Sequence, residues 1–217
     1  LLVDQVDPAQ FARAVIPNPN FARGHGLNLA EGAENKNMYV HTAVQRAPNQ
    51  AGWAVAMERV RLLSLFLGMA TVAGSWALAG QIWPYRREWQ VTAGCLIIFN
   101  PTFLYLSSGV TNDTLLIALC TWSFVLMVSL LQTSNHKISW REGLLALLLG
   151  CALLTKQTGF LLLPPALWVL RVRARQQQWT RQRTGLVLVG FLGLIAAVGG
   201  WWYLRNGLLY GDFLALS

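Results

Sequence analysis

The residues of this sequence that could do chemistry are a few charged side chains at the edges of long apolar runs. Lys156 lies near the middle of the apolar segment 143–170, where a cation is costly in hydrocarbon and is by default a sign of function. Asp113 and Arg205 stand beside other apolar runs. Lysine and arginine bind phosphate, and a carboxylate acts as a general base or positions an acceptor. This combination suits a polyprenyl-phosphate ligand, with its phosphate at the membrane boundary and its tail in an apolar groove.

Each of these residues also has a purely structural interpretation. Lys156 would reach the headgroups by extending its side chain, and Asp113 would cap the apolar helix that follows Asn112. Arg205 would anchor a helix end beside neighbouring tryptophans. Both interpretations stay open at the level of the sequence.

The composition indicates that membrane helices position these residues. Hydrophobic residues make up 54% of the 217 residues, charged residues only 12%, and the mean hydropathy is +0.42, which is unlike a soluble domain. The formal net charge is +8, but the arginines lie between apolar runs. The positions of these arginines therefore indicate loops that are retained on the cytoplasmic side of a membrane, rather than a nucleic-acid-binding surface. We predict an all-α integral membrane protein, a multi-span helical bundle of residues 53–217 with about six membrane segments: 61–83, 89–107, 115–131, 143–154, 158–170 and 185–203.

The segment 143–170 decides the topology. As a single helix its roughly 28 residues would be about 42 Å long, which exceeds the roughly 30 Å hydrocarbon core. As two helices, each half is short for a crossing. Two crossings place all three basic loops, around Arg86, Arg141 and Arg171, on one side of the membrane, as the positive-inside rule favours. We therefore predict two short helices joined at residues 155–159 on the outer side.

Residues 1–52 are polar and rich in proline, asparagine and glycine, and we expect an extracytoplasmic loop with short helices at 5–14 and 27–46. Both chain ends are then outside the plasma (inner) membrane. In this loop Glu34 is a candidate catalytic acid and His41 a candidate site-lining residue, although a solvated face and a structural histidine are the plainer interpretations. The three cysteines lack metal-ligand spacing, and no metal ligand set is evident, so a divalent metal cofactor is left open.

The predicted topology brings the candidate residues to one face. The catalytic candidates are Asp113 and Glu34, and Lys156 and Arg205 are the candidates for binding the donor phosphate. The candidates for lining the site are the remaining polar residues of the outer turns: Asn112, His41, Asn206, Tyr210 and Asp212.

Four blocks of sequence resemble a known group of enzymes. They are RVRLLSLFLGMATV, FNPTFLYLSSGVTNDTLL, GLLALLLGCALLTKQTGFLLLPPAL and GGWWYLRNGLLYGDFLALS, in that order, and they cover most of residues 59–217. Together they resemble the GT-C superfamily, and within it bacterial membrane glycosyltransferases similar to protein O-mannosyltransferases and the aminoarabinose transferase. The segment GHGLNLAEGAENKNMYVH is similar to the first outer loop of such enzymes.

The resemblance implies a function and a fold. It implies transfer of a sugar from a polyprenyl-phosphate donor on the outer face of the membrane, with inversion at the sugar carbon. It also implies a module of seven helices, of which the present six would be the second to the seventh. The first helix and the acidic pair expected after it are not in this sequence, so the catalytic base of the family is expected upstream of Leu1. By position, Asn112, Asp113, Lys156 and Arg205 match residues that line the donor site of the family.

Two other classes of function remain beside the enzyme. A non-catalytic membrane subunit or scaffold within a larger complex is favoured by the missing acidic pair, whereas the retained polar residues favour the enzyme. A transporter would usually show repeated halves and broken helices, and only the short helix pair fits. The expected partners are membrane lipids, a polyprenyl-phosphate sugar and, for the subunit, other membrane proteins, with no nucleic acid.

Overall fold

The computed structural model describes residues 16–17, 39–40, 52–133 and 140–213. The chain divides into two compact units, Leu1–Leu62 and Leu63–Ser217. In the first, the strands β1 (Ile16–Pro17) and β2 (Tyr39–Val40) pair antiparallel. The expected helix at 27–46 is therefore wrong at Tyr39 and Val40, because β-favouring residues find a partner strand that is distant in the sequence. The expected helix at 5–14, Glu34 and His41 lie outside the described residues.

The first membrane helices are long and apolar. Helix α2 covers Gly52–Ile82, and α5 covers Asn112–Gln132. Between them α3 (Arg87–Ile98) and α4 (Pro101–Ser108) bend by 64°. The predicted segment 89–107 is thus two helices, because Pro101 cannot continue the hydrogen-bond ladder of α3. Asn100 starts α4 by accepting a hydrogen bond from the Phe103 amide at 3.1 Å.

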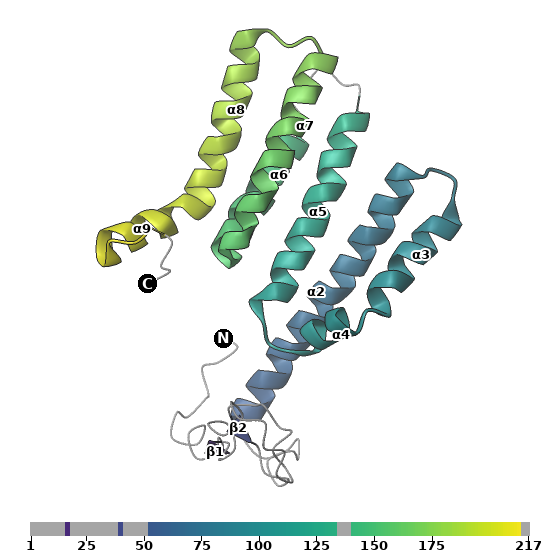
Figure 1. Ribbon diagram of the computed structural model, residues 1–217, viewed down its shortest axis with the longest axis vertical. Helices are drawn as coiled ribbons and strands as arrows, with labels where there is room; N and C mark the ends of the chain where they lie inside the picture. Colours follow the sequence, from purple (N-terminus) through teal and green to yellow (C-terminus); the bar gives the residue numbers. More distant parts are fainter. Residues whose placement is uncertain (1–15, 18–38, 41–51, 134–139, 214–217) are drawn as a thin grey trace, which may run out of the picture. The chain divides into compact units, whose positions relative to one another are not determined.

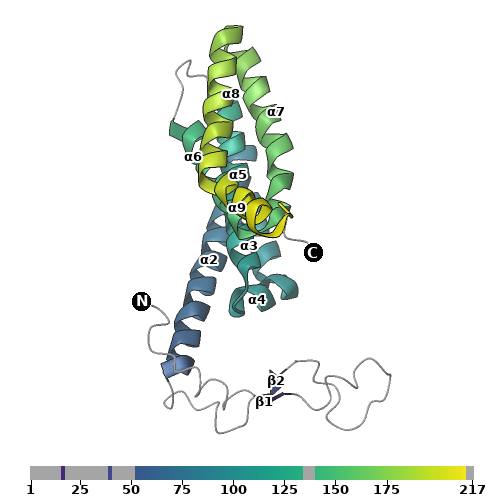
Figure 2. The ribbon, with the colours of Figure 1, turned by 90° about the vertical axis from the view of Figure 1, so that its left-hand side faces the viewer.

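The segment 143–170 forms a helical hairpin, that is, two helices joined by a tight turn. Helix α6 covers Trp140–Thr155, a 3-10 turn η2 covers Gln157–Leu162, and α7 covers Leu163–Gln176. The break at Lys156 falls within the predicted junction at residues 155–159. Figures 1 and 2 together show the hairpin between α5 and α8: α6 packs on α5, η2 and α8, and α7 contacts α5 and α8.

The last membrane segment is longer than expected. Helix α8 covers Arg181–Ile195, a π-helical turn η3 covers Ala196–Gly200, and α9 covers Trp201–Tyr210. The sequence predicts that helix ends at residue 203 with a loop beyond it, but helical structure continues to Tyr210. Figure 1 shows α9 turned away from the axis of α8. Arg205, Asn206 and Tyr210 are therefore helical residues.

The hydrophobic core lies where α5, the hairpin and α8 meet. Its fully buried members come mainly from α6 and its neighbours: Leu130, Leu145, Ala146, Leu149, Ala152 and Ala166. Many large apolar side chains elsewhere are exposed, such as Leu161 at 76% and Leu208 at 87%. So much apolar exposure suits a surface that faces lipid.

One arginine of the basic segment 171–183 belongs to the interior. The Arg173 side chain is 0% exposed, and its Nε lies 3.0 Å from Oε1 of Glu142, which is 5% exposed. Arg173 Nη1 also donates to the Leu130 carbonyl oxygen at 2.8 Å. The basic loop predicted around Arg171 is therefore wrong at Arg173, because Glu142, which is distant in the sequence, neutralises this arginine inside the bundle.

By length and composition, three described helical segments could cross a membrane: Val55–Ile82, Asn112–Gln132 and Arg181–Tyr210. The bent pair α3 and α4 raises the number to four. Helices α6 and α7 have 16 and 14 residues, or about 24 and 21 Å, below the roughly 30 Å of hydrocarbon. Six separate crossings therefore remain a prediction.

Candidate functional site at the tip of the helical hairpin

The tip of the hairpin presents Lys156 on extended backbone. Lys156 has φ −162° and ψ 144°, and it leads into η2. The turn folds back tightly on α6: a Cβ atom at Gly159 would lie 2.8 Å from the carbonyl carbon and oxygen of Ala152. Since no L side chain fits there, glycine permits the close return that exposes Lys156 at the tip.

The start of α5 contacts this tip through two polar side chains. Asn112 Nδ2 donates to the Thr155 carbonyl oxygen at 3.2 Å. Lys156 Nζ donates to Asp113 Oδ1 at 2.6 Å, and the two side chains are 43% and 33% exposed. The structure thus joins Asp113 and Lys156, 43 residues apart in the sequence.

Helix α9 is held at the same tip because the main chain of η3, which precedes it, packs against the main chain of α6. A Cβ atom at Gly199 in η3 would lie 2.8 Å from the Gly150 carbonyl oxygen of α6, so η3 and α6 touch through their main chains. The Tyr203 hydroxyl donates to the Leu153 carbonyl oxygen at 2.7 Å. Its ring also lies 5.3 Å from that of Phe160 in η2. A π-helical turn often marks a functional site, and here it carries the chain from α8 into α9 beside the hairpin tip.

A cavity of about 520 Å³ lies between the hairpin tip and α9. Its lining is mixed: the end of α6 and the start of η2 contribute one wall, and α9 contributes the other. Asn206 is 2% exposed and Arg205 stacks on Trp202, with its guanidinium carbon 5.3 Å from the ring centroid. The lining residues are Leu153, Leu154, Thr155, Lys156, Gln157, Thr158, Trp202, Tyr203, Arg205, Asn206 and Tyr210.

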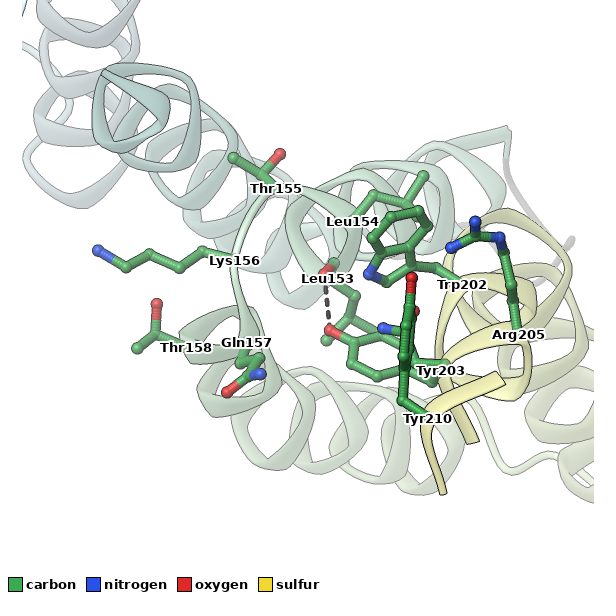
Figure 3. Close-up of a pocket in the computed structure, with 11 residues that line it drawn as sticks. Leu153, Leu154, Thr155, Lys156, Gln157, Thr158, Trp202, Tyr203, Arg205 and Tyr210 are labelled. Carbon is green, nitrogen blue, oxygen red and sulfur yellow. Dashed lines mark hydrogen bonds between the residues drawn. The ribbon is translucent and has the colours of Figure 1, made fainter. Parts of the chain in front are cut away.

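Figure 3 shows how the two cations lie in this arrangement. Arg205 and Trp202 are on one side, and Lys156 is on the other. The Lys156 ammonium group points away from Tyr203 and Arg205, because it is engaged by Asp113. In this structure the cavity therefore has the Arg205 guanidinium group on α9, whereas the ammonium group of its second cation, Lys156, is held by Asp113.

The structure brings most of the predicted site residues together. Lys156, Arg205, Asn206 and Tyr210 line the cavity. Asn112 and Asp113 contact its hairpin wall through Thr155 and Lys156. Asp212 is described, but it is not among the lining residues.

Two aromatic lining residues, Trp202 and Tyr203, were not among the predicted site residues. The sequence could have indicated Trp202 as a lining residue if the helix had been extended past residue 203. Trp202, Asn206 and Tyr210 then recur at i, i+4 and i+8, on one face. Among the described residues, no group of three His, Cys, Asp or Glu side chains could hold a metal ion.

Comparison with known protein families identifies the group to which this arrangement belongs. Residues 53–203 match the model of the dolichyl-phosphate-mannose-protein mannosyltransferase family. The chain belongs to this family. No curated protein and no solved structure matches the chain. Membership of the mannosyltransferase family indicates an integral membrane protein and, in general, membrane glycosyl transfer from a polyprenyl-phosphate sugar. The matched range contains Asn112, Asp113 and Lys156, whereas Arg205 lies just beyond it.

Proposed function

We propose that this chain transfers a sugar from a polyprenyl-phosphate donor at the outer face of the plasma membrane. In this proposal the cavity between the hairpin tip and α9 receives the donor phosphate. The observation that carries the proposal is that Lys156 and Arg205 line one cavity of about 520 Å³. They lie there beside aromatic residues and a nearly buried amide, Asn206.

The charges of the cavity favour an anion. Arg205 and Lys156 contribute two positive charges against the single negative charge of Asp113. An ion pair between side chains this exposed is worth only about 0–1 kcal/mol. A phosphate that Arg205 already holds through charge-assisted hydrogen bonds can therefore displace Asp113 from Lys156 at little cost. The stacking of Arg205 on Trp202 orients the guanidinium for such contacts.

The acids have separate proposed roles. Displaced from Lys156, Asp113 would be a free carboxylate next to the donor, placed to position an acceptor hydroxyl or to take its proton. From the sequence, Glu34 and His41 are proposed to complete the polar site. Asn112 holds the hairpin tip against α5 in this scheme, and Asp212 lies just beyond the end of α9.

The proposal is tested by Lys156→Ala and Arg205→Ala in the full chain, reconstituted in vesicles. Two probes are used: binding of polyprenyl phosphate, and transfer from polyprenyl-phosphate mannose. A hydrogen bond to a charged group is worth about 1.5–3 kcal/mol. Each substitution should therefore weaken polyprenyl-phosphate binding by about 10- to 150-fold. Arg87→Ala is the matched control, because it removes an exposed arginine from the opposite end of the helices and should leave binding unchanged.

The outcomes separate the enzyme from the non-catalytic subunit. Unchanged binding in both variants would exclude the phosphate roles of Lys156 and Arg205. Binding that depends on both residues, without transfer of any polyprenyl-linked sugar, would favour the non-catalytic subunit. Transfer that both substitutions abolish would establish the enzyme.

A further inference from the structure

An exposed face of α7 carries one tryptophan and two arginines in register. Trp168, Arg171 and Arg175 follow one another at i, i+3 and i+7, so they lie along one side of the helix. Trp168 is 60% exposed, and both arginines are exposed. Arg181, the first residue of α8, is exposed as well and follows α7 after a short connection. We call Trp168, Arg171, Arg175 and Arg181 the arginine face.

The arginine face lacks a compensating acid in the described chain. Between Gly143 and Gly211 the sequence contains no aspartate or glutamate. The acid that precedes this stretch, Glu142, is 3.0 Å from buried Arg173. Arg173 fixes the rotation of α7: residues two positions away point to roughly the opposite side of a helix. Arg171 and Arg175 are therefore turned outward, and neither forms an ion pair with a described acid.

The start of α8 adds a second, independent reason for an anion at this place. The first turn of α8 begins with the exposed Arg181 and contains no acid. Cations at a helix N-terminus are unfavourable, because that end of the helix dipole is already positive. Thr180 accepts a hydrogen bond from the Arg183 amide at 3.2 Å, which caps the helix but adds no negative charge. An external anion would relieve the repulsion.

The position of Trp168 indicates what supplies the anion. Trp168 lies seven residues before Arg175, or about 10 Å along the helix, within the apolar part of α7. Tryptophan prefers the boundary between hydrocarbon and headgroups, and arginines just beyond that boundary meet lipid phosphates. We propose that the arginine face binds the phosphate headgroups of anionic phospholipids. This surface is formed where α7 joins α8, at the end of α7 away from the candidate sugar-donor cavity, and it does not depend on the proposed function.

The test uses the purified full chain in detergent with equal amounts of phosphatidylglycerol and phosphatidylcholine of matched acyl chains. Native mass spectrometry measures which lipid stays bound. The expected contribution is about fivefold in affinity for each arginine. The double variant Arg171→Gln with Arg175→Gln should therefore lose about 30-fold of the preference for phosphatidylglycerol. The control, Arg86→Gln with Arg87→Gln, removes the same charge from the exposed connection between α2 and α3. There Glu88 lies 3.2 Å from Arg86 and offsets the basic charge, so this control should change the preference less than twofold.

A salt titration of the unaltered chain gives a second measurement that needs no substitution. Raising the ionic strength from about 0.05 to 0.5 M should erode the preference, because it shortens the Debye length below 10 Å. In the mass spectrometry experiment, the Arg86 and Arg87 control could lose as much of the preference for phosphatidylglycerol as the Arg171 and Arg175 variant. That result would show that total charge, rather than the arginine face, selects the lipid, and would overturn the proposal. Preserved preference in the Arg171 and Arg175 variant, or a preference independent of salt, would overturn it as well.

Discussion

The buried pair of Glu142 and Arg173 gives a prediction that depends on no substrate. The two side chains are 5% and 0% exposed, with 3.0 Å between Oε1 and Nε. Removing one partner breaks the ion pair and leaves the other charge inside the bundle, which costs about 3–5 kcal/mol. We expect Glu142→Gln and Arg173→Met each to lower the free energy of unfolding by about that amount. Arg173→Met also leaves the Leu130 carbonyl oxygen without its 2.8 Å hydrogen bond, for about 1 kcal/mol more.

The double variant is the decisive measurement. With both charges gone, neither desolvation penalty remains, so Glu142→Gln with Arg173→Met should cost less than either single substitution. The expected loss is about 1–2 kcal/mol, mainly from the unpaired Leu130 carbonyl oxygen. The assay is equilibrium unfolding in mixed detergent micelles, followed by circular dichroism of the helices. Single substitutions that each cost less than about 1 kcal/mol, or a double variant whose loss equals the sum of the singles, would refute a buried, coupled pair.

Three further predictions concern the hairpin tip and its orientation. Gly199→Ala should destabilise the fold by about 1–3 kcal/mol, because its Cβ would overlap the main chain of α6. The control is Gly193→Ala in α8, whose Cβ would meet open space. It should be neutral or stabilising in the same unfolding assay. Tyr203→Phe removes one hydrogen bond between α9 and α6, so it should lower the free energy of unfolding by about 1 kcal/mol. It should also weaken polyprenyl-phosphate binding. A loss of stability without any change in binding would contradict the role of Tyr203 in positioning α9. In a chain whose native cysteines are replaced by alanine, Thr158→Cys should react with an impermeant thiol reagent from outside the cell and Gln182→Cys should not. The reverse labelling would overturn the predicted outer location of the tip.

Local sequence features were sufficient for some elements of the fold. The charges flanking the segment 143–170 and its length predict a hairpin rather than one helix, and the structure has a break at Lys156. By contrast, the segment 89–107 was predicted as one span, and the structure divides it where Asn100 and Pro101 start α4. The side of the membrane on which the tip lies stays a prediction, since it depends on the bilayer and not on the fold alone.

Other features could not be read locally because their causes are distant in the sequence. Arg173 resembles its neighbours in the basic segment, and only the approach of Glu142 and Leu130 makes it a buried residue. The continuation of helix to Tyr210 depends on the packing of η3 against α6. The pairing of Tyr39–Val40 with Ile16–Pro17 likewise depends on a distant partner.

By itself, the sequence determined that this is a membrane protein of helices, with its few polar residues at their ends. That information is local, because hydropathy and loop charge depend on the solvent around each segment. Only the tertiary structure decided which of those residues meet. It joined Lys156 to Asp113 at 2.6 Å and placed Arg205 across the same cavity, because contacts such as that of Gly199 with Gly150 fix where one helix ends relative to another.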